Sequence, residues 1–164
     1  MKLVRTTFFF SVLLFNVACN NAVPIEVNPL QVKAEATGPL FSGINTATAD
    51  FKISEILPDG VKQDQIAKAQ IKSITLRSIG EGVPNVLSYT ALLASPNQEM
   101  SQVAFLNDQK TGEVSLTLAE DQSFVEAILR DPSQTLVIDF DLSEDYFDNW
   151  TFDVTVEWDL SINQ

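Results

Sequence analysis

The sequence predicts an all-β protein: an antiparallel β-sandwich, immunoglobulin-like in arrangement, with seven or eight strands and one short helix near residues 123–130. Apolar and polar residues alternate with a period of two over most segments of strand length. Gly, Pro, Asn and Asp separate these segments at short intervals and supply the backbone angles that turns require. Short, half-buried strands with frequent turns are typical of two packed antiparallel sheets.

The first 18 residues are expected to be an export signal rather than part of the fold. Lys2 and Arg5 form a positive head, and the apolar run "FFFSVLLF" that follows is too short to be a good membrane span. A basic head, a short apolar centre and small residues at the end are the pattern of a secretory signal.

The end of this signal, "FNVAC", resembles the signal of bacterial lipoproteins, in which a peptidase cuts just before a Cys that carries a diacylglycerol thioether. Val17 and Ala18 suit the two positions before the Cys, whereas Asn16 stands where Leu is usual. The resemblance covers the first 19 residues and implies a lipid on Cys19, the one Cys of the chain. The alternative is an ordinary signal peptide with an accidental Cys.

Loss of the signal leaves a strongly acidic chain without histidine. The remaining 8 bases and 22 acids give a formal charge near −14, which repels nucleic acid and anionic headgroups. The absence of His excludes Ser-His-Asp and Cys-His catalysis and histidine-ligated metals. We therefore expect a non-catalytic protein that does not bind nucleic acid.

A short tether is expected over residues 19–29, ending in a first edge strand, and the β-sandwich domain over residues 30–164. The last strand, residues 150–162, has the clearest alternation, because every even position is apolar and every odd position is polar. Such a strand has one face on a core and one in water. The other strands are expected at residues 31–36, 46–54, 70–78, 86–94, 102–106, 113–118 and 135–142.

One helix of about two turns is expected at "SFVEAILR", before Pro132. Ser123 and Glu126 have the spacing of a capping box, and Phe124 and Ile128 form an i,i+4 apolar pair. A helix this short must pack on the sheets to be stable. A further single turn is expected from Asp64.

The order of these elements resembles small bacterial lipoproteins that contain immunoglobulin-like sandwiches. The likeness lies in the strand "IKSITLRS", a long strand, a hairpin, a short helix and two final strands, over about residues 46–162. It contains no diagnostic motif, so it implies a fold and no activity.

The acidic stretch "DFDLSEDYFDNW" raises the question of calcium. Asp139, Asp141 and Asp145 have the spacing of calcium ligands, but an EF-hand loop also needs a Gly and a bidentate Glu that are missing here. If the last two strands form a hairpin, Asp139 lies opposite Asp153, with a repulsion of about 0.8 kcal/mol at ~5 Å in water. A cation bound by these four aspartates would relieve it. A shifted register, or strands in different sheets, would relieve it too, and the alternative to calcium is a solvated acidic face.

Tyr146 and Phe147 are unusual in a turn that faces water. Exposed, they could contact a sugar or a protein partner. Alternatively, both rings fold back over the open end of the sandwich.

These observations predict a lipid-anchored module of a Gram-negative cell envelope, at the outer membrane. We expect it to be a non-catalytic structural or protein-interaction module that needs no cofactor and meets an envelope protein or glycan. The alternative is a glycan-type ligand-binding accessory domain, with or without calcium as a stabilising ion.

Overall fold

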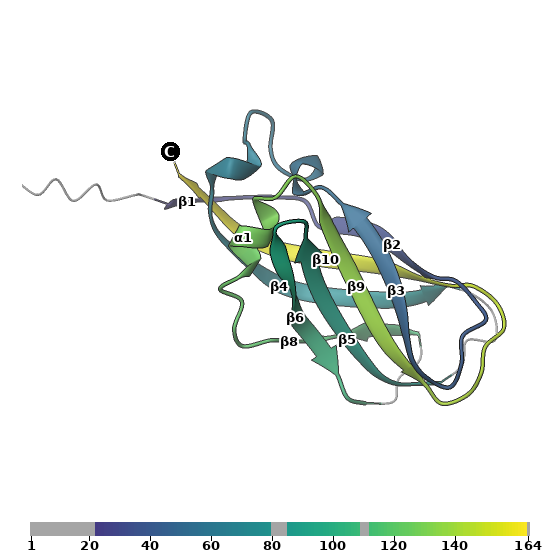
Figure 1. The fold of residues 1–164 in the computed structure, drawn as a ribbon. Helices are drawn as coiled ribbons and strands as arrows, with labels where there is room; N and C mark the ends of the chain where they lie inside the picture. The colour runs from purple at the N-terminus through teal and green to yellow at the C-terminus, as the bar shows by residue number, and fades with distance from the viewer. Residues whose placement is uncertain (1–21, 80–84, 109–111, 164) are drawn as a thin grey trace, which may run out of the picture.

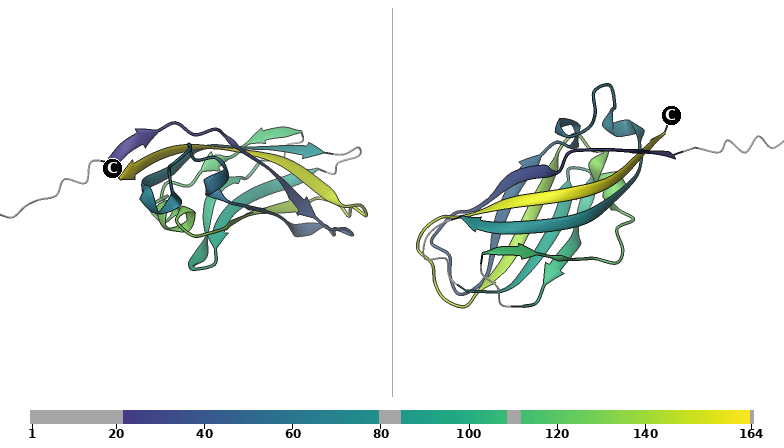
Figure 2. Two further views of the ribbon diagram at one scale, coloured as in Figure 1. Left: turned by 90° about the horizontal axis from the view of Figure 1, so that it is seen from above. Right: turned by 180° about the vertical axis from the view of Figure 1, so that it is seen from behind.

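The computed structural model describes residues 22–79, 85–108 and 112–163, which form two antiparallel leaflets packed face to face (Figures 1 and 2). One leaflet has the order β7-β4-β10-β2 and the other the order β3-β9-β5-β6-β8. A single pairing, Glu35 with Thr48, connects β2 to β3 and links the leaflets. The strands are β1 Ala22–Ile25, β2 Leu30–Ala36, β3 Gly43–Phe51, β4 Ile66–Ile79, β5 Val86–Ser95, β6 Gln98–Leu106, β7 Glu113–Ser115, β8 Thr117–Leu118, β9 Gln134–Leu142 and β10 Trp150–Asn163.

The predicted antiparallel sandwich is confirmed, and its strand order is that of a jelly roll. β5 pairs with β6, β4 with β7, β3 with β9 and β2 with β10, so the pairs are nested like one long hairpin that has been rolled up. The immunoglobulin arrangement instead has its first two strands side by side in the same sheet. Here β1 and β2 both pair with β10, and the strand that follows them, β3, lies in the other leaflet.

The predicted strand at residues 113–118 is divided between the leaflets. Residues 113–115 pair with β4, residues 117–118 pair with β6, and the Leu116 N–H between them donates to the Ile74 carbonyl at 2.9 Å. This segment therefore covers one side of the sandwich. The other predicted strands are present, with ends that differ by a few residues.

Alternate residues of β9 and β10 fill the core between the leaflets. Leu136, Ile138, Phe140 and Leu142 are buried, as are the even residues of β10 from Trp150 to Leu160. At one end the core is aromatic: the Phe140 ring lies 5.2 Å from both the Trp150 and the Phe152 rings, centroid to centroid. Edge-on ring contacts of this kind add to the apolar burial.

The predicted helix is present as α1 Val125–Leu129, but its capping box is not. The residue before the helix is Phe124, with no side-chain cap, and Glu126 instead forms an ion pair with Arg130 at 2.8 Å. The buried side chain of Gln134 accepts from the Ile53 N–H at 2.9 Å and donates to carbonyls at the C-terminal end of α1. Two 3-10 helices, η1 Ile53–Glu55 and η2 Gln63–Gln65, lie in the β3–β4 connection, and η2 supplies the turn predicted from Asp64.

The sandwich has two different ends. β1 pairs with the last residues of β10, so the two described termini lie together with α1 and the 3-10 helices; we call this the entry end (Figure 1). The loops 37–42 and 143–149 lie at the opposite end, the loop end (Figure 1). Because residues 22–25 are a strand of the sheet, the tether predicted over residues 19–29 is partly folded. No helix in the described segments is long and apolar enough to cross a membrane.

Candidate functional site

The two loops of the loop end are joined into one unit, which we call the loop pair (residues 37–42 and 143–149). Leu40 and Tyr146 exchange two backbone hydrogen bonds, of 2.7 and 2.8 Å. The Ser42 N–H donates to Asp145 Oδ1 at 2.8 Å, and the Gly38 N–H donates to Asn149 Oδ1 at 2.9 Å. These bonds fix the backbone of both loops before any partner arrives.

The loop 37–42 is also held by the side chain of Asn45, which lies on β3. Its Nδ2 donates to the carbonyls of Phe41 and Gly43 at 2.7 and 2.9 Å, and its Oδ1 accepts from the Phe41 N–H at 3.3 Å. Phe41 is nevertheless 60% exposed. The Phe41 ring is therefore exposed on a backbone that is held by hydrogen bonds.

The two aromatic residues predicted at this turn behave differently. Tyr146 folds back against the core, with its ring centroid 5.6 Å from that of Trp150. Phe147 is 74% exposed. Phe147 is thus the exposed ring that the sequence predicts, and Tyr146 follows the alternative in which the ring folds back. Phe41 is a second exposed ring in the loop pair, and the sequence did not single it out.

Other exposed apolar side chains gather at the same end. Within the described residues, five of the six large apolar side chains that are exposed belong to the loop pair or to strand ends beside it. They are Phe41, Ile44, Ile79, Leu87 and Phe147. The sixth, Met100, lies on β6 just after the β5–β6 turn, at the other end. An apolar rim confined to one end indicates a surface that contacts something.

The four aspartates of the predicted calcium site do not lie together. Asp139 faces Thr46 and Thr90 on the neighbouring strands and accepts from Thr46 Oγ1 at 2.6 Å. Asp141 lies beside Ile44 and Ser88, and Asp145 accepts from Ser42 in the loop pair. In the described part of the chain, no three acidic, Cys or His side chains are grouped so that they could hold a metal ion.

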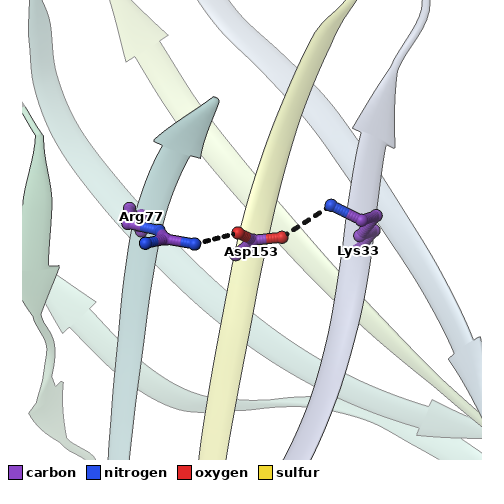
Figure 3. Close-up of polar contacts among 3 residues, drawn as sticks. All are labelled: Lys33, Arg77 and Asp153. Carbon is purple, nitrogen blue, oxygen red and sulfur yellow. Dashed lines mark hydrogen bonds and ion pairs between the residues drawn. The ribbon is translucent and has the colours of Figure 1, made fainter. Parts of the chain in front are cut away.

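Of the arrangements considered for Asp139 and Asp153, the structure has the one with the two strands in different sheets. β9 and β10 lie in different leaflets, so they form no hairpin, and the like-charge repulsion does not arise. Asp153 instead lies between two cations of the adjacent strands, Lys33 of β2 and Arg77 of β4 (Figure 3). Its Oδ1 is 2.8 Å from Lys33 Nζ and its Oδ2 is 2.6 Å from Arg77 Nη2.

The hydrogen bonds in this row shift the ionisation of its members. The bond from Lys33, with that from Arg77, lowers the pKa of Asp153, and the bond to Asp153 raises the pKa of Arg77. The two cations are 61% and 62% exposed and the carboxylate is 29% exposed, so Asp153 lies deeper than its partners. The row is part of the lining of a groove of about 470 Å³ on the outer face of β2, β10 and β4.

Cys19 lies outside the described residues, so its lipidation stays a prediction.

No protein-family model matches the sequence, and no curated protein matches it. A solved structure described as "Structural basis for the promiscuous specificity of the carbohydrate-binding modules from the beta-sandwich super family" is similar, with 16% identity and a TM-score of 0.37. The match covers 85% of this chain and 57% of that one. The jelly-roll assignment rests on this chain's own strand order.

Proposed function

We propose that this protein is a lipid-anchored, non-catalytic module of the bacterial cell envelope that binds a protein partner through its loop end. One observation carries the proposal: a fixed loop pair displays Phe41 and Phe147 at the end of the sandwich opposite to the entry end. Apolar rings exposed on a fixed backbone lower the entropy that must be lost on binding, which is the advantage of a preorganised site.

The charge of the loop pair restricts the kind of partner. Its sequence contains three acids, Glu144, Asp145 and Asp148, and no base. An anionic membrane, a nucleic acid or a second copy of this acidic chain would be repelled. We therefore propose a partner protein with an apolar pocket surrounded by basic side chains.

A photo-crosslinking residue tests the contact in living cells. p-Benzoylphenylalanine at position 147 is expected to give a discrete cross-linked species, and the same residue at Met100, which is also exposed but at the other end, is expected to give none. Equal cross-linking from both positions, or none from position 147, contradicts the proposal.

The lipid anchor is tested separately. Cys19→Ser is expected to move the protein from the membrane fraction to the soluble fraction and to abolish labelling by an alkyne analogue of palmitate. Continued partition of this variant with membranes contradicts the lipoprotein assignment. A Gram-negative outer membrane is the location that we propose, and sucrose-gradient separation of inner and outer membranes tests it.

A further inference from the structure

The groove on the outer face of β2, β10 and β4 is independent of the loop end and has a different chemistry. Seven polar side chains of its lining lie in two rows across the strands. The row containing Asp153 runs Lys33, Asp153, Arg77, Glu113 over β2, β10, β4 and β7, in register. Two residues further along the strands, the second row runs Gln31, Thr155, Thr75.

This arrangement forms a grid of hydrogen-bonding groups on a hollowed surface. Adjacent strands lie about 4.8 Å apart and residues of one face about 6.8 Å apart along a strand, so four strands extend over about 14 Å. The first row offers donors and acceptors in alternation, and the second offers amides and hydroxyls that can do both. The volume of about 470 Å³ lies within the range of small-molecule sites.

The net charge of the groove is the second observation. Two bases and two acids balance among the described residues of the lining, although the mature chain carries about 14 more acids than bases. The other leaflet differs, because the outer face of β3 and β9 contains Asp50, Asp139 and Asp141 and no base. A balanced face attracts neither anions nor cations strongly, and its charged groups remain available as hydrogen-bond partners.

Both cations keep donors that Asp153 does not use. Lys33 has three N–H donors and Arg77 has five, and each forms an ion pair with Asp153, at 2.8 and 2.6 Å. Asp153 holds both cations in place, which orders their remaining donors. The ligand that matches ordered donors and acceptors without net charge is a neutral chain rich in hydroxyl groups.

We propose that this groove binds a neutral oligosaccharide, held by hydrogen bonds to the two rows. Among the described residues the lining contains no aromatic side chain, so the binding is proposed to rest on hydrogen bonds rather than on ring stacking. The proposal does not depend on the loop end or on the lipid anchor.

The test is an NMR titration of the ¹⁵N-labelled mature chain carrying Cys19→Ser, so that no lipid is attached. The probes are cellohexaose, mannohexaose, chitohexaose and, as the charged comparison, hexagalacturonate. At least one neutral hexasaccharide is expected to shift the amides of Lys33, Thr75, Arg77 and Thr155 at millimolar concentration, more strongly than hexagalacturonate. If none of the neutral probes shifts these amides, or if hexagalacturonate binds better, the proposal is overturned.

Isosteric variants separate the groove from the rest of the surface. Thr75→Val with Thr155→Val removes two hydroxyl groups and is expected to weaken neutral binding at least fivefold. Thr48→Val, the same change at an exposed position of β3, is expected to leave it unchanged. Thermal melting of each variant confirms folding, and equal affinity of a folded double variant and the wild type refutes the role of the second row.

Discussion

Tyr146 and Phe147 are adjacent aromatic residues whose truncation should have opposite consequences. Tyr146 packs on Trp150 and on the edge of the core and is partly buried. An aromatic side chain buries about 150–250 Å², so Tyr146→Ala removes roughly 120 Å² of buried ring. At about 25 cal/mol per Å² this lowers the free energy of unfolding by about 3 kcal/mol. Phe147 is 74% exposed, so Phe147→Ala should change it by less than about 1 kcal/mol.

Urea unfolding of residues 19–164 with Cys19→Ser, followed by tryptophan fluorescence, measures both values. Binding of the partner should depend on Phe147 although folding does not. Photo-cross-linking from position 41 is therefore expected to be lost in a Phe147→Ala background at normal protein abundance. If Phe147→Ala destabilises the fold as much as Tyr146→Ala, the Phe147 ring is a structural element and our reading of the loop end is refuted.

Three further predictions follow from individual contacts. A Cβ on Gly38 would lie 2.5 Å from the Asp148 carbonyl oxygen, so Gly38→Ala should cost about 1–3 kcal/mol in urea unfolding, whereas Thr37→Ala should cost less than about 0.5; equal costs would contradict the close approach of the two loops. Because bonds from Lys33 and Arg77 lower the pKa of Asp153 from 3.8, its stabilising effect is present above about pH 4 and is lost as the pH falls through the lowered pKa. Thermal melts should therefore show a deficit of Asp153→Asn at pH 7 that narrows toward pH 2; a constant deficit would contradict this. Burial raises the pKa of Tyr89 from 10.0 to about 12, so wild-type stability should fall by about 2 kcal/mol between pH 10 and pH 12, and Tyr89→Phe should lack that loss; the same loss in both proteins would exclude Tyr89 as its cause.

The strands could be predicted because period-two alternation is a local property. β10 is the clearest case: its even residues are apolar in the sequence and buried up to Leu160 in the structure. The order of the strands could not be predicted in the same way, because alternation gives each strand an inner face but no neighbour. Residues 113–118 illustrate this limit, since their pattern is that of one strand and their pairing is with two leaflets.

The neighbours of each candidate site residue are set by strand pairing, which the local sequence pattern does not reveal. Asp139 and Asp153 both point outward as their alternation requires, but only the leaflet assignment determines that one faces threonines and the other faces Lys33 and Arg77. Phe41 lies in a segment whose Gly and Pro mark it as a turn. Nothing local in the sequence indicates that the Asn45 side chain and the second loop hold that turn with the ring outward.

The position of β1 determines how far the loop end would stand from a membrane. If Cys19 carries the lipid as we propose, only residues 20 and 21 separate it from a strand of the sheet, and they span at most about 10 Å. β10 has 14 residues, so it extends over about 46 Å from the entry end to the loop end. With so short a link, the loop pair lies at most about 50 Å from the bilayer. The partner of Phe41 and Phe147 must therefore present its binding surface within this distance of the membrane. Lengthening the link by 20 Gly/Ser residues should weaken cross-linking from position 147 to a membrane-fixed partner while leaving it unchanged for a freely diffusing one.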